Sequence, residues 1–193
     1  YDIASVQVLK GPQAGLYGRN TMGGAVLITT GQPTEELSAH LDTSYAQYGS
    51  KVVNGTVNVP LSDSVRLRST LWYNDRDGGY YKSQRLDKDI EASRERGGRL
   101  PFGFEPNERT AITLTGDYDE IKWTGFSWPD GLVEGAQLGP PPLPPESRHN
   151  VLRDDLGGSE QDVSGVNGKL DFDTTAGSFV ALAGWRRASI HVP

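Results

Sequence analysis

Hydrophobic and polar residues alternate along most of the chain after Pro33, with the two-residue period of a β-strand. The first alternating run extends from Leu37 to Tyr45, and the second from Val53 to Leu61. A third run, from Val65 to Tyr73, carries arginine, threonine and tryptophan between its apolar positions. Each run therefore predicts a strand with one apolar face and one polar face.

The remaining alternation predicts four more strands. One is expected from Ser93 to Phe104, although Pro101 weakens this prediction because proline cannot donate to a sheet ladder. Another is expected from Thr110 to Lys122. Two more, around residues 166–172 and 179–185, are separated by a short turn that indicates a hairpin. The total is about seven strands, and all of them can be antiparallel neighbours.

The connections between these strands differ in length. Residues 61–64 and 105–108 form short turns, whereas residues 80–92 and 123–161 are long and lack periodicity. The longest connection contains the run GPPPLPP at residues 139–145, which favours a stiff surface loop over a docking motif for a peptide-binding module. Alternating short and long connections are typical of the two rims of an outer-membrane barrel.

Before Pro33 the pattern is different, because two short apolar segments flank a glycine-rich interval. Val6, Val8 and Leu9 belong to the first segment, and the run AVLITT at residues 25–30 forms the second. So many glycines in so few residues predict tight turns and close backbone approach. A phosphate-binding loop is the alternative, but the interval has neither G-x-G-x-x-G nor Gly-Lys-Ser/Thr spacing, and a β-branched segment follows it.

The same residues resemble the end of the plug domain of TonB-dependent outer-membrane receptors. The positions that carry the resemblance are Lys10, Gly11, Pro12, Leu16, Tyr17, Gly18, Arg19, Gly23, Gly24, Ala25 and Ile28. The resemblance implies an all-β chain with two parts. Residues 1–33 would be the C-terminal piece of the plug domain, and residues 34–193 would supply about seven antiparallel strands of an incomplete transmembrane β-barrel.

Two further expectations follow from this resemblance. A barrel with a plugged lumen has about 22 strands, so about seven strands would form an open, curved sheet with two edges. In a receptor of this family a signal peptide, a TonB-contacting segment and most of the plug would precede Tyr1. We therefore expect the sequence to be a fragment of a longer receptor.

Composition and charge exclude several classes of protein. A net charge of -6 opposes nucleic-acid binding, and the absence of cysteine excludes disulfides and thiolate metal sites. His40, His149 and His191 are far apart and match no metal-ligand spacing. The acidic pairs lack the spacing of a calcium loop or a glycosidase pair. No catalytic residue, metal site or cofactor is expected, and the protein is not expected to be an enzyme.

The resemblance implies an energy-coupled transport receptor in the bacterial cell outer membrane that imports a scarce nutrient, most often a ferric siderophore. Its implied partners are the TonB complex of the inner membrane, an extracellular small-molecule ligand and outer-membrane lipid. The candidate ligand-binding residues are Tyr17, Arg19 and Asn20 in the plug segment and Trp123, Phe126, Trp128, Arg148 and His149 in the longest connection.

Alternatives remain for these residues and for the whole chain. In this family the plug arginine more often pairs with carboxylates of the barrel wall, which is the structural alternative for Arg19. Trp123, Phe126 and Trp128 suit an interfacial aromatic girdle as well as a ligand-stacking surface. A passive porin-like barrel would share the alternation but has no reason to carry the plug segment. A soluble β-sandwich carbohydrate-binding module would also contain short alternating strands.

Overall fold

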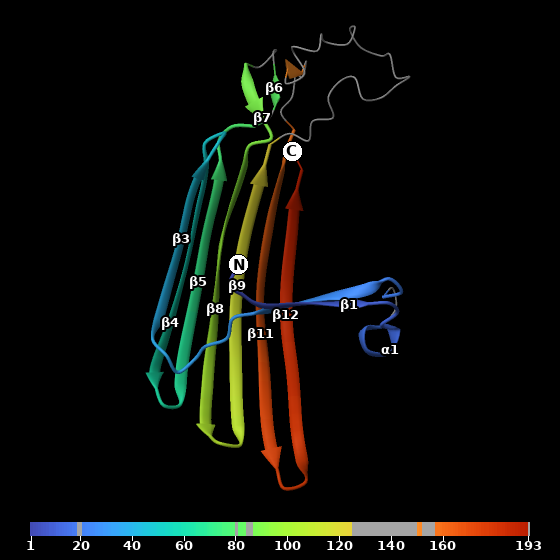
Figure 1. Cartoon of the computed structure of the whole chain (residues 1–193), viewed down its shortest axis with the longest axis vertical. Helices are drawn as coiled ribbons and strands as arrows, with labels where there is room; N and C mark the ends of the chain where they lie inside the picture. The colour runs from blue at the N-terminus through green and yellow to red at the C-terminus, as the bar shows by residue number, and fades with distance from the viewer. Residues whose placement is uncertain (19–20, 80, 84–86, 125–149, 152–156, 193) are drawn as a thin grey trace.

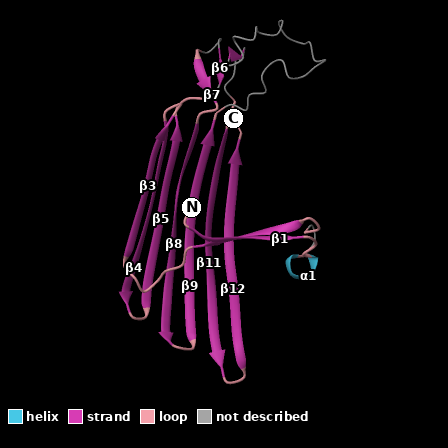
Figure 2. Ribbon diagram, viewed as in Figure 1, coloured by secondary structure: helices cyan, strands magenta, loops and turns pink. Residues whose placement is uncertain are grey.

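The computed structural model describes residues 1–18, 21–79, 81–83, 87–124, 150–151 and 157–192 of the chain (Figure 1). A seven-stranded sheet makes up most of it, and a two-stranded arm projects from the side of this sheet (Figure 2). A small three-stranded sheet lies beyond one end of the long strands. Among the described residues, no helix is long and apolar enough to cross a membrane.

The arm is formed by the two apolar segments on either side of the glycine-rich interval. Strand β1 (Ile3–Lys10) pairs antiparallel with β2 (Gly24–Thr30), and the short helix α1 (Ala14–Tyr17) lies between them. Gly18 ends the helix with φ 76°, and Gly24 begins β2 with φ 137°, where a side chain would collide with the carbonyl oxygen of Leu9. The glycines therefore provide tight turns and close backbone approach, as the sequence predicts.

The seven-stranded sheet is antiparallel, and its strands lie in chain order from one edge to the other. The strands are β3 (Ser38–Ala46), β4 (Ser50–Ser62), β5 (Val65–Arg76), β8 (Ser93–Asn107), β9 (Thr110–Trp123), β11 (Ser159–Thr174) and β12 (Gly177–His191). Short turns join β4 to β5, β8 to β9 and β11 to β12 at one end, and the long connections lie at the other (Figure 1). This arrangement confirms the predicted number and order of strands.

Strand β8 continues through Pro101, where the sequence prediction was weakest. Pro101 pairs with Thr115 of β9, but on the other side the register passes from Thr70–Arg99 to Leu67–Phe102. The ladder to β5 thus has no pair at the proline, and Pro101 itself is fully buried. A missing N–H on one side is tolerated because fourteen other residues hold the strand in place.

Residues 80–92, predicted to lack regular structure, contain two short strands. Strand β6 (Tyr81–Ser83) pairs with β7 (Lys88–Ile90), and β10 (Asn150–Val151) pairs with β6 in parallel. Ile90 is fully buried. The sequence prediction was wrong here because strands of two or three residues are too short to show a period of two.

The two faces of the long sheet differ in polarity, because residues paired across strands point to the same side. The inner face, which contacts the arm, carries mainly polar and charged side chains. It includes Asn58, Arg66, Arg68, Thr70, Asn74, Glu95, Arg99, Thr115, Asp117, Asp119, Asn167, Lys169 and Arg186.

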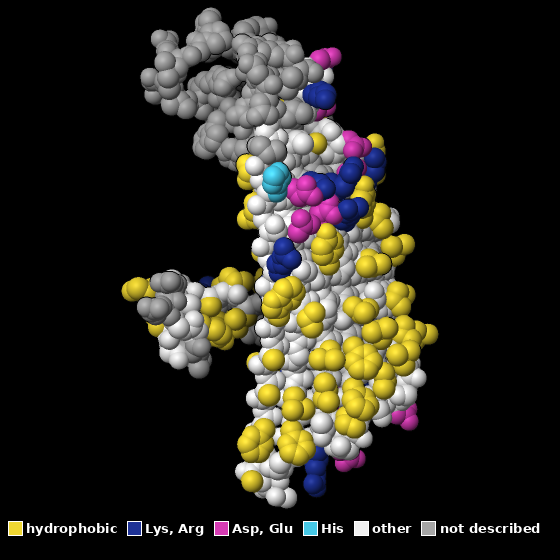
Figure 3. All heavy atoms as spheres, turned by 180° about the vertical axis from the view of Figure 1, so that it is seen from behind, with side chains coloured by type: hydrophobic (Ala, Val, Ile, Leu, Met, Phe, Trp, Pro, Cys, Tyr) yellow, Lys and Arg dark blue, Asp and Glu magenta, His cyan; other side chains and the backbone are white. Residues whose placement is uncertain are grey.

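The outer face carries a broad band of apolar side chains that no other described element covers (Figure 3). The band includes Leu41, Val57, Leu71, Leu100, Leu114, Val166, Leu170, Phe172, Phe179 and Trp185. A soluble antiparallel sheet would turn such a face toward a core, so an uncovered apolar band suits strands that contact lipid.

Candidate functional site

The candidate site is the place where the beginning of the chain and the end of the arm meet the inner face of the long sheet. Three groups of contacts hold it together: an ion pair at Asp2, an aromatic stack at Tyr1, and hydrogen bonds to the segment that follows the arm. All three groups reach β4, β5 or β9. The site therefore fixes the position of the arm relative to the seven-stranded sheet, which we call the wall.

Asp2 forms the central contact, which we call the Asp2 latch, with Arg68 and Thr70 of β5. The Arg68 guanidinium donates from Nη2 to Oδ1 of Asp2 at 2.6 Å and from Nε to Oδ2 at 2.7 Å. The Thr70 hydroxyl donates to Oδ2 at 3.1 Å. The two charged side chains are 11% and 18% exposed, so this bidentate pair is largely shielded from water.

Gly31 makes room for the latch. Its N–H donates to the carbonyl oxygen of Asp2 at 2.8 Å, which joins the end of β2 to the start of β1. A side chain at this position would begin 2.6 Å from the Asp2 carboxylate and 2.8 Å from Nε of Arg68. The chain therefore has glycine where the arm leaves the wall.

Tyr1 stacks on Trp72, the next inward-facing residue of β5 after Thr70. The ring centroids are 4.7 Å apart and the planes differ by 8°. The Trp72 Nε1–H donates to Oδ1 of Asp119 on β9 at 2.8 Å, and Asn74 donates to the Tyr1 hydroxyl oxygen. Gly97 of β8 leaves space for the indole, because a side chain there would begin 2.5 Å from Cζ2 of Trp72. The stack thus rests on three neighbouring strands.

The segment after the arm, residues 34–36, is hydrogen-bonded to Asn58, a fully buried residue of β4. Its amide donates to the carbonyl oxygens of Thr34 at 3.0 Å and Glu36 at 2.5 Å, and its Oδ1 accepts from the Thr34 N–H at 2.9 Å. Arg66 of β5 pairs with Glu35 of the segment and with Glu105 of the wall. A single asparagine therefore satisfies three backbone groups where the chain enters the sheet.

Between the arm and the wall lies a cavity of about 920 Å³ with a strongly charged lining. The lining includes Arg66, Arg99, Glu95, Asp117 and Arg186, and Arg186 pairs with Asp117 at 2.9 Å. Nη1 of Arg99 is buried and has no hydrogen-bond partner in the described part of the chain. A cavity of this kind suits a polar or charged guest better than an apolar one.

Tyr1 and Asp2, which lie outside the long strands of the sheet, have shifted pKa values. Hydrogen bonds from Arg68 lower the pKa of Asp2 below its ordinary value, partly opposed by burial. Burial raises the pKa of the Tyr1 hydroxyl, and the nearby Glu95 carboxylate raises it further. Asp2 is therefore ionised, and Tyr1 neutral, at neutral pH.

The lowered pKa of Asp2 predicts how acid affects the latch. A carboxyl whose pKa is lower in the folded protein stabilises that state above the ordinary aspartate value of about 3.9, and the contribution is lost as the pH falls through the folded-state pKa. We expect the urea midpoints of the unchanged full-length protein and its Asp2→Asn variant to differ by a constant amount from about pH 5 to 8 and to converge below about pH 4. A difference that persists undiminished to about pH 2 would contradict the assignment.

The structure describes two of the eight candidate ligand-binding residues. Tyr17 is exposed in α1, at the outer tip of the arm, and Trp123 is exposed at the end of β9 that leads into the longest connection (Figure 1). These two positions lie apart, since α1 is at the tip of the arm and β9 ends at the far end of the long sheet (Figure 1). Arg19, Asn20, Phe126, Trp128, Arg148 and His149 lie outside the described residues.

Residues that the sequence analysis did not single out form the site. Asp2, Arg68, Trp72, Asn58 and Arg99 lie at ordinary positions of alternating strands or at the start of the chain. The only signal available was a run of charged and aromatic residues on the polar face of β5, which alone does not identify a partner. The described residues contain no group of three or more histidine, aspartate or glutamate side chains that could hold a metal ion.

Among curated proteins, this chain is similar in sequence to bacterial receptors. No family model matches the sequence. The chain is 26% identical over 109 residues to the pesticin receptors of Yersinia enterocolitica and Yersinia pestis, a stretch that covers 56% of this chain and 16% of each receptor. The chain thus spans only a small part of the curated relatives that it matches.

Solved structures show the same fold over nearly the whole chain. The ferric yersiniabactin uptake receptor FyuA from Yersinia pestis matches 99% of this chain with a TM-score of 0.79 and 16% identity. The siderophore receptor PiuA from Acinetobacter baumannii matches 100% with a TM-score of 0.78 and 14% identity, and the ferripyoverdine receptor of the outer membrane of Pseudomonas aeruginosa matches 97% with a TM-score of 0.75 and 18% identity.

The matched regions cover 29%, 27% and 24% of these three receptors, so the chain again corresponds to a part of each. The likenesses confirm the all-β fold and the resemblance to outer-membrane receptors that the sequence predicts. The chain therefore has the fold of a part of these three receptors.

Proposed function

We propose that this chain is part of an energy-coupled outer-membrane transport receptor for a scarce nutrient, and that the nutrient is a ferric siderophore. The observation that carries the proposal is the Asp2 latch, which anchors a glycine-rich arm to the polar face of a sheet whose other face is apolar. In a closed barrel this polar face lines the lumen, so the arm obstructs the path. Transport through the lumen therefore needs a partner protein that moves the arm.

The same contacts support a division of the chain into two parts. We propose that residues 1–33 end the plug and that residues 34–193 belong to the barrel wall. The hydrogen bonds of Asn58 with Thr34 and Glu36 hold the chain to the wall directly after Pro33. The proposed energy source is the TonB complex of the inner membrane, which would act through a segment that precedes the plug.

The relatives support the proposed class of ligand. FyuA is a ferric yersiniabactin uptake receptor, and the Pseudomonas aeruginosa receptor was solved bound to ferripyoverdine. The charged cavity beside the arm can accept a polar ligand as the ligand moves through the lumen. We propose Tyr17, Arg19 and Asn20 on the plug side, and Trp123, Phe126, Trp128, Arg148 and His149 on the loop side, as residues that contact the ligand.

The two alternatives from the sequence fit the structure less well. A passive porin-like barrel would keep its lumen open, whereas the base of the arm is fastened to the polar face by the latch and the Tyr1 stack. A β-sandwich would cover its apolar face with a second sheet, and no described element covers the outer band. Transport, and not catalysis, is the activity we propose.

Uptake measurements on the full-length protein test the proposal. A bacterial strain that lacks its own siderophore receptors would be supplied with the full-length gene and with a panel of radioactive ferric siderophores. We expect uptake of at least one of them when TonB is present and its loss when TonB is deleted. Trp123→Ala should weaken binding of that siderophore, because stacking on an exposed tryptophan is lost.

Two outcomes would contradict the proposal. Uptake that continues unchanged without TonB, together with steady ion conductance in planar bilayers, would indicate a passive pore. A full-length product that is soluble and folds cooperatively without detergent would indicate a soluble module. If uptake depends on TonB but Trp123→Ala binds normally, only the placement of the ligand at Trp123 is wrong.

A further inference from the structure

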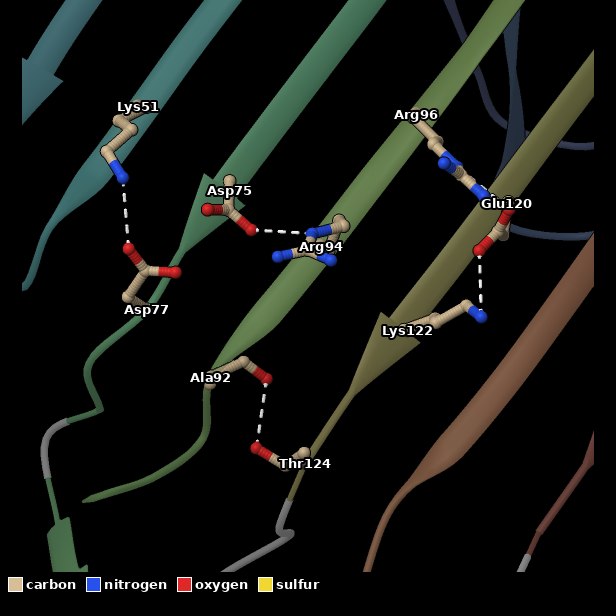
Figure 4. Close-up of polar contacts among 9 residues, drawn as sticks. All are labelled: Lys51, Asp75, Asp77, Ala92, Arg94, Arg96, Glu120, Lys122 and Thr124. Atoms are coloured by element: carbon tan, nitrogen blue, oxygen red, sulfur yellow. Dashed lines mark hydrogen bonds and ion pairs between the residues drawn. The ribbon is translucent and has the colours of Figure 1, made fainter. Parts of the chain in front are cut away.

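Two arginines on the outer face of the long sheet pair with the carboxylates that strand register places opposite them (Figure 4). Arg94 lies opposite Asp75 and contacts it at 2.8 Å from Nε to Oδ1. Arg96 lies opposite Glu120 and contacts it at 2.6 Å from Nη2 to Oε2. Cross-strand register is therefore enough, in this sheet, to join an arginine to a carboxylate.

Arg99 of β8, on the inner face, does not follow this pattern. It lies opposite Asp117 of β9 by register, but no hydrogen bond or ion pair joins Arg99 to any residue that the structure describes. Asp117 pairs instead with Arg186 of β12, whose Nη2 donates to Oδ1 at 3.0 Å and to Oδ2 at 2.9 Å. The carboxylate opposite Arg99 is thus bound by another arginine.

Gly165 of β11 allows this longer pair to form. It lies between Asp117 and Arg186 in one row of the sheet. A side chain at this position would begin 3.1 Å from both carboxylate oxygens of Asp117 and 3.2 Å from Nε of Arg186. The ion pair therefore passes directly over the glycine, and a larger residue would disturb it.

The carboxylate on the other side of Arg99 is bound as well. Thr70 is the register partner of Arg99 on β5, and its hydroxyl donates to Asp2. The Asp2 carboxylate also accepts from both Nε and Nη2 of Arg68. Along this part of the inner face three guanidinium groups share two carboxylates, so Arg99 has no counter-ion of its own.

The cavity of about 920 Å³ beside the arm provides room for the missing anion. Arg99, Asp117 and Arg186 all line it. Its volume falls within the range of about 300–1,000 Å³ that is usual for small-molecule sites. Nη1 of Arg99 is buried, and a buried cation without its own counter-ion is costly. A guanidinium group binds carboxylate or phosphate oxygens through directed hydrogen bonds, so an oxyanion suits this position.

We propose that the cavity binds a small solute through an oxyanion group, a carboxylate or a phosphate, that pairs with Arg99. The bound group supplies the third anion for the three arginines of this part of the inner face. The site goes beyond the transport function, because it depends only on the charges and the space between the wall and the arm. The oxyanion belongs either to a free solute or to a ligand that passes through the lumen.

Isothermal titration calorimetry of the full-length protein in non-ionic detergent at neutral pH tests the proposal. Succinate and inorganic phosphate are the anionic probes, and dimethyl succinate is the uncharged probe. We expect both anions to bind and the uncharged ester to give no binding signal. Arg99→Gln should weaken binding of both anions on the order of tenfold, because the charged donor is lost.

Two further variants should change the affinity for succinate in opposite directions. Asp117→Asn removes a competing negative charge and should strengthen binding about threefold. Arg186→Gln frees Asp117 to pair with Arg99, so it should weaken binding almost as much as Arg99→Gln does. Arg187→Gln is the matched control, since it makes the same chemical change one residue away on the opposite face, and it should leave the affinity unchanged.

Three outcomes would overturn the proposal. The first is an affinity for succinate in Arg99→Gln equal to that of the unchanged protein, and the second is equal weakening by Arg187→Gln. The third is the absence of binding of either anion to the unchanged protein, which would indicate that a carboxylate elsewhere in the full-length chain already pairs with Arg99.

A second titration distinguishes the two sources of the oxyanion. Its probes are a ferric trihydroxamate chelate with a free terminal carboxylate and the primary amide of the same chelate. Binding of the carboxylate form alone, with loss in Arg99→Gln, assigns the oxyanion to a ligand that passes through the lumen. No difference between the two forms, with succinate still bound, assigns it to a free solute. These titrations contain no TonB, so this pattern in a protein without TonB-dependent uptake would keep the anion site and reject the transport function.

Discussion

Arg68→Ala is expected to release the arm from the wall and to speed hydrogen exchange of residues 1–31 by on the order of 100-fold. The substitution leaves the Asp2 carboxylate, 11% exposed, with only the Thr70 hydroxyl as a partner. Removing one member of a buried ion pair costs about 3 kcal/mol, and each 1.4 kcal/mol is about a factor of ten. Hydrogen exchange with mass spectrometry on the full-length protein measures the effect, with the Gly31 N–H as the most direct reporter.

Arg66→Ala is the matched control for this experiment. Arg66 lies two residues away on the same strand face and makes two ion pairs, but their carboxylates are hydrated, since Glu35 is 80% exposed and Glu105 is 46% exposed. Both carboxylates stay hydrated when the arginine is lost, so we expect a change of about 1 kcal/mol or less. The double variant Asp2→Ala, Arg68→Ala should exchange more slowly than Arg68→Ala alone, because no buried charge remains. Equal exchange in the two arginine variants would show that the latch does not hold the arm.

Gly97→Ala is expected to destabilise the full-length protein by about 2 kcal/mol through overpacking against Trp72. The new methyl group would begin 2.5 Å from Cζ2 and 2.6 Å from Cε2 of the indole, and it would collide with the carbonyl oxygen of Tyr118. The indole must move, which weakens both its hydrogen bond to Asp119 and its stack with Tyr1. Urea unfolding in detergent, followed by tryptophan fluorescence, measures the loss.

Gly116→Ala on the neighbouring strand separates this effect from the general effect of adding a methyl group to a strand. No atom lies within 4 Å of a side chain at Gly116, so its urea midpoint should stay the same or rise slightly. If both glycine variants lost the same stability, contact with Trp72 would not be the cause. In that case the Tyr1 stack would contribute little to anchoring the chain.

Much of the fold could be predicted from the sequence because its elements are long and periodic. The runs from Leu37 to Tyr45 and from Val65 to Tyr73 have an unbroken period of two, and both form strands. Pro101 shows where the prediction was weakest, since only the register reveals that one side of β8 tolerates a missing donor. Strands β6 and β10 could not be predicted, because two or three residues carry no period.

The candidate site could not be predicted in the same way. Asp2 and Arg68 are 66 residues apart, and Trp72 and Asp119 are 47 apart, so nothing local in the sequence joins them. The residues chosen from the sequence, such as Tyr17 and Trp123, were chosen by motif or by aromatic character. The structure places those two apart and leaves their role as ligand contacts a proposal.

The sequence by itself determined the strands, their alternating faces and the glycine-rich arm, because these depend on periods and backbone preferences within a few residues. Only the tertiary structure decided which side chains meet. Strand register places Arg96 opposite Glu120, whereas the packing of the start of the chain against the inner face places Asp2 against Arg68. The same alternation thus places Arg68 on the inner face, where it holds Asp2, and Arg94 and Arg96 on the outer face, where they pair with Asp75 and Glu120 of the neighbouring strands.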